Sequence, residues 1–165
     1  MTRCYIGLGS NLANAQGDSI QILRDAVKAL AKIGTVQVSQ LYHTPPMGPQ
    51  DQPDYWNAVA MLDTELQALE LLDYLQACEQ AAGRVRLRHW GERTLDLDLL
   101  LYGDEQIQHE RLTVPHAGIL QRDFVLIPLL DLDADLQILG QRIAESDVVQ
   151  SSPLKPYQDS TWANE

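Results

Sequence analysis

The sequence predicts an α+β fold with an antiparallel sheet and helices packed on it. Short apolar runs that are typical of strands recur along the first 102 residues. Two segments with apolar residues at helical spacing separate these runs. The elements follow the order strand–helix–strand–strand–helix–strand (βαββαβ). This is the split βαβ order of a ferredoxin-like sandwich.

The first half of the chain supplies the first three elements. Residues 4–8 form a short buried strand that ends in a polar turn. Asp18 caps a helix that Gly34 ends. The apolar positions of this helix fall at helical spacing at Ile20, Leu23, Val27 and Leu30. Residues 36–43 alternate apolar and polar side chains, which predicts a half-buried strand.

The second half of the pattern begins after an irregular segment. Residues 44–53 hold four of the eight prolines and cannot pair as a central strand. A strand resumes at residues 55–62. An amphipathic helix over 69–82 stops at Gly83, and a strand follows at 96–102.

Residues beyond the βαββαβ pattern are C-terminal additions to it. The apolar segment 124–132 predicts a further helix. From residue 145 the chain becomes polar and carries proline and serine, so we expect 145–165 to be a loosely held tail. The length suits one domain, so we assign 1–165 to a single domain.

Composition and charge exclude several classes of partner. Lys and Arg total 12 against 23 Asp and Glu, and the formal net charge is −11. A nucleic acid or an anionic membrane needs a broad basic surface, so we expect neither. No apolar run is long enough to span a bilayer, and no signal-peptide core is visible. Cys4 and Cys78 lack metal-ligand spacing and predict free thiols. We therefore expect a cytoplasmic protein, and a monomer.

Two aspartates interrupt the apolar strand at 96–102. Asp96 and Asp98 are two residues apart, so both side chains point to one face of the strand, and the neighbouring leucines point to the other. Two carboxylates held together repel each other, and a divalent cation relieves that repulsion. Magnesium accepts one or two protein carboxylates and leaves its other positions to water and phosphate. This pair predicts a Mg²⁺ site.

Arginines gather immediately before the two aspartates. Four of the nine arginines fall within ten residues, and two more bring the count between 84 and 122 to six: Arg84, Arg86, Arg88, Arg93, Arg111 and Arg122. A local excess of guanidinium groups in an acidic protein indicates a small anionic ligand, and arginine forks suit phosphate oxygens. No Walker loop is present. We expect a nucleoside triphosphate held by arginines and Mg²⁺.

A second group of residues is suited to a flat heterocycle. Tyr55 and Phe124 have rings that can sandwich such a molecule, and Asn57 can read its edge through paired hydrogen bonds. Thr44 lies at the start of the proline-rich segment, which would form a rigid wall. His116 is a candidate phosphate donor, and Gln76 and Glu79 share a helix face.

Together these segments resemble the 6-hydroxymethyl-7,8-dihydropterin pyrophosphokinase family of folate biosynthesis over residues 5–130. The resemblance rests on the combination of motifs, since no single one would suffice. They are Gly9-Ser10-Asn11-Leu12, Tyr42-His43-Thr44-Pro45-Pro46-Met47-Gly48-Pro49-Gln50, Tyr55-Trp56-Asn57, Gly83-Arg84-Val85-Arg86, Trp90-Gly91-Glu92-Arg93-Thr94-Leu95-Asp96-Leu97-Asp98 and Arg111-Leu112-Thr113-Val114-Pro115-His116.

The resemblance implies a ferredoxin-like fold and pyrophosphoryl transfer from ATP to the pterin hydroxymethyl group, with release of AMP. It implies two Mg²⁺ ions at Asp96 and Asp98, with Arg84 and Arg93 on the reacting phosphates. The implied nucleotide contacts are Gln76, Glu79, Arg86, Trp90, Arg93, Leu99, Arg111, Thr113, His116 and Arg122. The implied pterin contacts are Thr44, Pro45, Met47, Tyr55, Asn57 and Phe124.

Two other functions remain as alternatives. A ferredoxin-like module that senses a nucleotide would account for the fold and the arginines, but it gives no reason for paired carboxylates beside a flat-ring pocket. An ordinary kinase would release ADP instead of AMP. The nucleotide product distinguishes all three.

Overall fold

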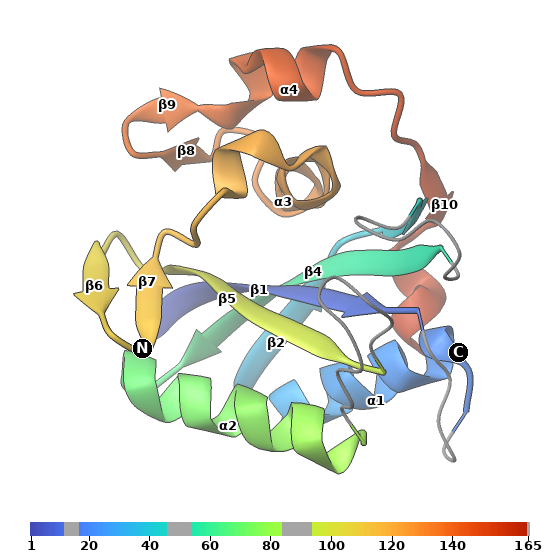
Figure 1. Cartoon of the computed structure of the whole chain (residues 1–165), viewed down its shortest axis with the longest axis vertical. Helices are drawn as coiled ribbons and strands as arrows, with labels where there is room; N and C mark the ends of the chain where they lie inside the picture. The colour runs from blue at the N-terminus through green and yellow to red at the C-terminus, as the bar shows by residue number, and fades with distance from the viewer. Residues whose placement is uncertain (12–16, 46–53, 84–93, 165) are drawn as a thin grey trace.

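The computed structural model describes residues 1–11, 17–45, 54–83 and 94–164 (Figure 1). Its centre is an antiparallel sheet in which β1 (Thr2–Ser10) lies between β4 (Tyr55–Thr64) and β5 (Asp96–Tyr102). No helix within the described ranges has the length and apolar character needed to cross a membrane.

The next strand beyond β4 is divided in two. The sequence predicts one strand over 36–43, whereas the structure has β2 (Gly34–Val38) and β3 (Leu41–Thr44), both paired with β4. The break lies at Ser39, whose Oγ accepts a hydrogen bond from the Val59 backbone N–H at 2.9 Å. The serine hydroxyl takes the place of a backbone acceptor and interrupts the regular ladder.

Two helices cover one face of this sheet (Figure 1). They are α1 (Ser19–Leu30), which Asp18 caps through the Gln21 N–H, and α2 (Ala68–Ala81), which begins with a capping box. The helix α1 ends four residues before Gly34, which instead opens β2. A Cβ at Gly34 would lie 2.1 Å from the Asp63 carbonyl oxygen, so the strand pairing itself requires glycine there.

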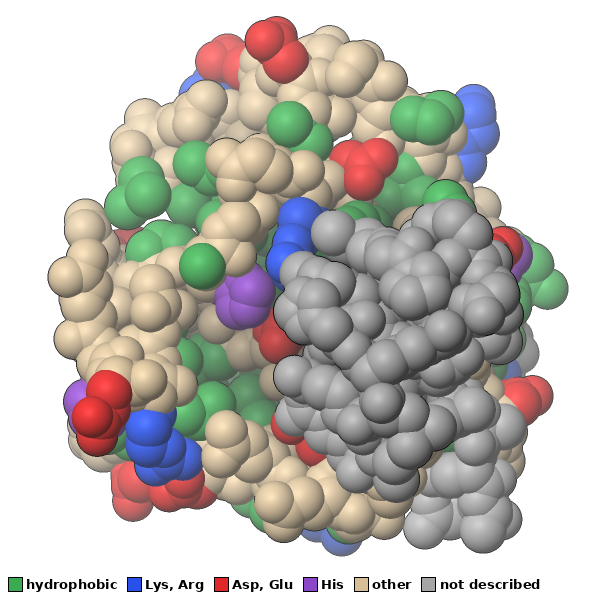
Figure 2. All heavy atoms as spheres, in the orientation of Figure 1, with side chains coloured by type: hydrophobic (Ala, Val, Ile, Leu, Met, Phe, Trp, Pro, Cys, Tyr) green, Lys and Arg blue, Asp and Glu red, His purple; other side chains and the backbone are tan. Residues whose placement is uncertain are grey.

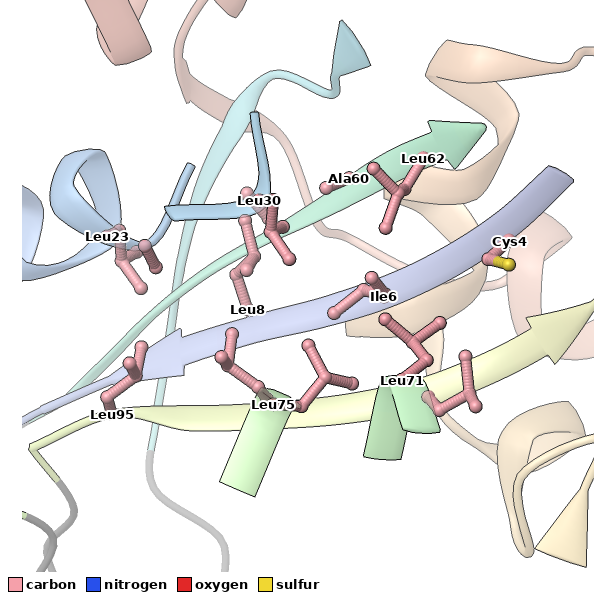
Figure 3. Close-up of a cluster of buried hydrophobic side chains, with 14 of the residues drawn as sticks. Cys4, Ile6, Leu8, Leu23, Leu30, Ala60, Leu62, Leu71, Leu75 and Leu95 are labelled. Atoms are coloured by element: carbon pink, nitrogen blue, oxygen red, sulfur yellow. The ribbon is translucent and has the colours of Figure 1, made fainter. Parts of the chain in front are cut away.

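The main apolar core lies between this face of the sheet and the two helices. Figure 3 shows Ile6 and Leu8 of β1 pointing toward Leu23 of α1 and Leu71 and Leu75 of α2. All five side chains are buried. Alternate residues of β1, β4 and β5 therefore join one continuous core, and the residues between them face the opposite side of the sheet.

A second layer covers the opposite face. It consists of α3 (Asp123–Leu132), the hairpin of β8 (Gln137–Ile138) and β9 (Gln141–Arg142), and α4 (Asp147–Gln150) (Figure 1). A smaller hairpin, β6 (Ile107–His109) and β7 (Leu112–Val114), follows β5. The predicted α+β class, the order of elements along the chain and the antiparallel sheet with packed helices are confirmed, with β2 and β3 together taking the place of the second strand.

The C-terminal segment differs from the expected loosely held tail. After α4 it runs around the sheet edge, where β10 (Pro156–Gln158) pairs with β3, and it ends in a 3-10 helix, η3 (Ser160–Asn164), beside α1 (Figure 1). Trp162 is fully buried, and its Nε1 donates to the Ser39 carbonyl at 2.9 Å. One large aromatic side chain anchors a segment whose composition is otherwise polar.

Both cysteines are free thiols. Burial raises the pKa of Cys4 to about 12, and it also raises the pKa of Cys78. The thiolate is the reactive form, so little of either residue is reactive at pH 8. We expect iodoacetamide at pH 8 to label neither cysteine rapidly in the native protein and both in denaturant, as measured by intact-mass spectrometry. Rapid native labelling of Cys4 would contradict this burial.

Candidate functional site

The two aspartates of β5 face away from the main core. Leu97 and Leu99 are buried in that core, whereas Asp96 and Asp98 lie on the α3 side of the sheet and are partly exposed. The alternation expected from the sequence is therefore present. It places both carboxylates at the surface of two pockets, which differ in their linings.

The first pocket lies between the sheet and the beginning of α3. About 730 Å³ of space, open solvent included, lies between its walls. Its walls combine apolar side chains with a few polar ones, as in pockets for small organic molecules. Among the residues that line it are Gly7, Gly9, Thr44, Pro45, Tyr55, Asn57, Asp96, Asp98, Arg122 and Phe124.

A buried amide occupies one wall of the first pocket. The Nδ2 of Asn57 donates to Thr44 Oγ1 at 2.7 Å, and the Oδ1 lies 3.3 Å from the position that a Cβ would take at Gly9. Asn57 is on β4 and Thr44 on β3, so the pairing of the two strands places them together. The amide is held in one orientation, which suits it to recognise the edge of a heterocycle.

Glycines of β1 form the floor of this pocket. Gly7 and Gly9 point to the same face as Asp96 and Asp98, and a side chain at either position would enter the pocket. The sequence analysis assigns neither glycine to the site. The usable signal was their spacing, because two glycines at i and i+2 of a buried strand indicate close approach by another group.

The opposite wall comes from the start of α3. Phe124 lies there, and the guanidinium carbon of Arg122 is 5.9 Å from the centre of its ring. The resemblance assigned Arg122 to the nucleotide, but the structure places it in the first pocket beside the residues expected to bind the pterin. Its position just before α3 explains the difference, since residues of this helix line the first pocket and none lines the second.

The second pocket lies on the other side of β5. It is bounded by α2, β5 and residues 111–117, and about 730 Å³ of space, open solvent included, lies between its walls. It brings together six residues that the resemblance assigned to the nucleotide. They are Gln76, Glu79, Leu99, Arg111, Thr113 and His116.

Glu79 ties α2 to the strand that carries the aspartates. It is 3% exposed, and its Oε2 accepts a hydrogen bond from the Leu97 backbone N–H at 2.8 Å. This N–H lies between Asp96 and Asp98 in the sequence, so the buried carboxylate helps to fix the position of both. The sequence alone predicts Glu79 only as a ligand contact.

Arg111 and His116 occupy the rim of the second pocket. Arg111 donates to Asp73 Oδ1 at 2.5 Å and to Gln76 Oε1 at 3.2 Å. These exposed contacts add little stability, but they orient the guanidinium group. The Nε2 of His116 lies 3.9 Å from Asp98 Oδ1, and its backbone N–H bonds to the Leu100 carbonyl.

The two pockets meet at the paired aspartates, because Asp96 and Asp98 line both. Figure 2 shows acidic, histidine and cationic side chains gathered on this face between the α3 layer and the α2 layer. Within the described residues no group of three or more His, Cys, Asp or Glu side chains converges as a metal cage. Two carboxylates beside open space nevertheless fit Mg²⁺, which takes its other ligands from water and phosphate.

Five predicted site residues lie outside the described residues. They are Met47, Arg84, Arg86, Trp90 and Arg93. The predicted residues that the structure describes fall into two groups on either side of Asp96 and Asp98, and Arg122 is the one that changes group.

Solved structures with the same fold provide one comparison. A crystal structure of HPPK-DHPS in complex with substrates matches with a TM-score of 0.68 at 14% identity, over 86% of this chain and 43% of that one. Plasmodium falciparum HPPK-DHPS matches with a TM-score of 0.64 at 14% identity, over the same shares of the two chains. This chain thus spans less than half the length of these proteins, and the likeness supports the fold alone.

Sequence comparisons are more specific. A 2-amino-4-hydroxy-6-hydroxymethyldihydropteridine pyrophosphokinase of Haemophilus influenzae is 50% identical over 150 residues, which is 91% of this chain and 93% of the relative. The enzyme of the same name in Pseudomonas aeruginosa is 51% identical over 136 residues, covering 82% of this chain and 83% of the relative. The model of the family described as 7,8-dihydro-6-hydroxymethylpterin-pyrophosphokinase (HPPK) matches residues 5–134. The chain therefore belongs to the 7,8-dihydro-6-hydroxymethylpterin-pyrophosphokinase family.

Proposed function

We propose that this chain transfers a pyrophosphoryl group from ATP to 6-hydroxymethyl-7,8-dihydropterin, giving the pterin diphosphate and AMP. Its family and its close relatives make it a pyrophosphokinase of folate biosynthesis, with ATP as co-substrate. The observation that carries the chemistry is that Asp96 and Asp98 line both pockets. Two substrates in these pockets would meet at the carboxylates.

The first pocket is the proposed pterin site. Its apolar walls and the aromatic rings of Tyr55 and Phe124 suit a flat ring system. Asn57, held by Thr44, would read the edge of the pterin through its amide. From the resemblance, Pro45 and Met47 would complete this site. The glycine floor leaves the room that the ring needs.

The second pocket is the proposed nucleotide site. Arg111 and His116 at its rim would bind phosphate oxygens, and Gln76, Leu99 and Thr113 would contact the nucleoside. The resemblance adds Arg86, Trp90 and Glu79 to this site. It also places Arg84 and Arg93 on the reacting phosphates. Cationic groups at those phosphates would stabilise the charge that develops during transfer.

We propose that Asp96 and Asp98 hold two Mg²⁺ ions. When bound, these ions would neutralise the triphosphate and favour deprotonation of the attacking hydroxyl. The protein's own contribution is positional. Glu79 fixes the strand between the aspartates, and the two pockets orient the pterin hydroxymethyl group and the triphosphate toward each other.

Product analysis tests this function. Purified protein would be incubated with Mg²⁺, ATP and 6-hydroxymethyl-7,8-dihydropterin, and the nucleotides separated by ion-exchange chromatography. We expect AMP in a one-to-one ratio with the pterin diphosphate. ADP would indicate an ordinary kinase, and binding of ATP without turnover would indicate a nucleotide sensor.

Asn57→Ala is expected to weaken pterin binding selectively. The change removes the paired hydrogen bonds to the heterocycle and leaves Thr44 without its partner. We expect the KM for the pterin to rise roughly tenfold to a hundredfold, from the loss of one or two hydrogen bonds in a buried site. The KM for ATP should change less than twofold. Equal rises for both substrates would place Asn57 outside the pterin site.

We also propose a cytoplasmic location and a monomeric state. The two free thiols suit a reducing compartment. Multi-angle light scattering of the purified protein tests the oligomeric state, and a mass near 18.5 kDa is expected for a monomer.

A further inference from the structure

The side of β3 that faces α3 is connected to that helix by a polar cluster, which we call the Asp131 latch. It comprises Asp131 near the end of α3, Gln40 just before β3 and Tyr42 within β3. The carboxylate accepts from the Tyr42 hydroxyl at 2.6 Å, from the Gln40 backbone N–H at 3.2 Å and from Gln40 Nε2 at 3.1 Å. Three directional bonds to one carboxylate define a single arrangement of strand and helix.

The partners of this carboxylate are well fixed. Tyr42 is 1% exposed, and burial together with the neighbouring Asp131 raises the pKa of its hydroxyl, which therefore stays a donor. On the helix side, Leu126 and Leu129 are fully buried in the second apolar layer and anchor α3. Apolar packing alone is not directional, so the latch supplies the specific register between the two elements.

The latch lies next to the proposed pterin pocket. Tyr42 is the cross-strand partner of Asn57. Because side chains alternate along a strand, Tyr42 and Thr44 of β3 lie on the same face of the sheet. Thr44 and Asn57 form the polar wall of the first pocket, while α3 carries Phe124 of the opposite wall. The carboxylate thus joins the two elements that hold opposite sides of the pocket.

We propose that Asp131 is a positioning residue for the first pocket: its bonds to Tyr42 and Gln40 set the spacing between the polar wall on β3 and β4 and the aromatic wall on α3. This inference rests on the proposed function, because the ligand whose binding it affects is the pterin. The second pocket is lined by α2, β5 and residues 111–117, none of which bonds to the latch residues in the contacts described, so we expect ATP binding to change little when the latch is broken.

Binding measurements on full-length variants test the inference. Tyr42→Phe removes only the hydroxyl, and Asp131→Asn retains the size of the side chain. A matched control is Asp135→Asn, which makes the same charge change just after α3, at a carboxylate bonded to Arg142 and not to the sheet. Pterin affinity would be measured by calorimetry in the presence of a non-hydrolysable ATP analogue with Mg²⁺, and affinity for the analogue would be measured separately.

We expect Tyr42→Phe and Asp131→Asn each to raise the Kd for the pterin roughly threefold to tenfold, the range that one lost hydrogen bond produces. The Kd for the analogue should change less than twofold, and Asp135→Asn should bind both ligands like the wild type. Because both variants act on the same latch, their effects should not add, and the double variant should bind the pterin no more weakly than the weaker single one.

A purely structural role would lower the melting temperature and leave the Kd for the pterin unchanged at a temperature where the protein is folded. That outcome would overturn the inference, and so would equal losses of affinity for pterin and analogue. Failure of the wild type to bind the pterin would instead count against the proposed function, so the two failures are distinguishable.

Discussion

Asp96→Asn is expected to lower kcat by about three orders of magnitude or more. Asp96 lines both pockets, and the substitution removes a carboxylate from the pair that would hold Mg²⁺ where the two substrates meet. Charge stabilisation by metal ions contributes several kcal/mol to such reactions, and each 1.36 kcal/mol is about tenfold in rate. Initial rates of AMP formation at saturating Mg²⁺ measure the effect.

The same variant should fold normally. Replacing one of two neighbouring like charges removes repulsion on β5, so we expect the melting temperature to stay constant or rise, as is common for substitutions at functional sites. Asp104→Asn makes the same change at an exposed turn after β5 and should keep full activity. An Asp96→Asn protein with more than about a tenth of wild-type kcat would contradict the role proposed for this carboxylate.

The largest effect on stability is expected for Trp162→Ala. The indole is fully buried against the main core and bonds to the Ser39 carbonyl, so its removal leaves a cavity and an unpaired acceptor. Truncation of a buried tryptophan typically lowers the free energy of unfolding by about 3 to 5 kcal/mol. Denaturation in guanidinium chloride, followed by circular dichroism, measures this difference.

A matched control comes from the same segment. Tyr157 is 61% exposed and contacts Trp56 and His43 at the surface. We expect Tyr157→Ala to cost about 1 kcal/mol or less. If the two alanine variants had the same stability, the C-terminal segment would not be anchored by Trp162, and its ordered path around the sheet would contribute little to folding.

Periodicity was sufficient to predict most of the fold. The alternation of Leu95, Asp96, Leu97 and Asp98 correctly assigned each side chain to a face of β5, because a strand offers only two faces. Helices α1 and α2 were found within a few residues because their apolar positions and caps agree. Strand alternation, helix periodicity and helix caps all involve residues that are close together in the sequence, so a short stretch of sequence is enough to show them.

Features that depend on distant partners were not visible in the sequence. The break between β2 and β3 depends on a hydroxyl of Ser39 that meets Val59, twenty residues away in the chain. The ordered C-terminal segment depends on one indole among polar neighbours. No window of sequence that is short enough to show periodicity contains both partners of either contact.

The candidate site also combines features that local sequence predicts with features that depend on distant contacts. Residue types suggest roles for Asp96, Asp98, Asn57 and Phe124; the structure places all four around the first pocket, and their roles stay predictions. The sequence did not place Arg122 in the first pocket. Which pocket this residue lines depends on where α3 begins relative to the sheet. The bond from Leu97 to Glu79 was equally invisible, since it joins distant elements, whereas the glycine floor left a signal in the spacing of Gly7 and Gly9.

The distance in sequence between Ser39 and Trp162 has a consequence for synthesis of the chain. These residues are 123 positions apart. At 5 to 20 residues per second, a ribosome needs roughly 6 to 25 s after making Ser39 before it adds the indole. Throughout that time the site for Trp162 between α1 and the β2–β3 junction has no occupant from the nascent chain. The emerging protein therefore exposes an apolar surface that a chaperone can bind until Trp162 has been made.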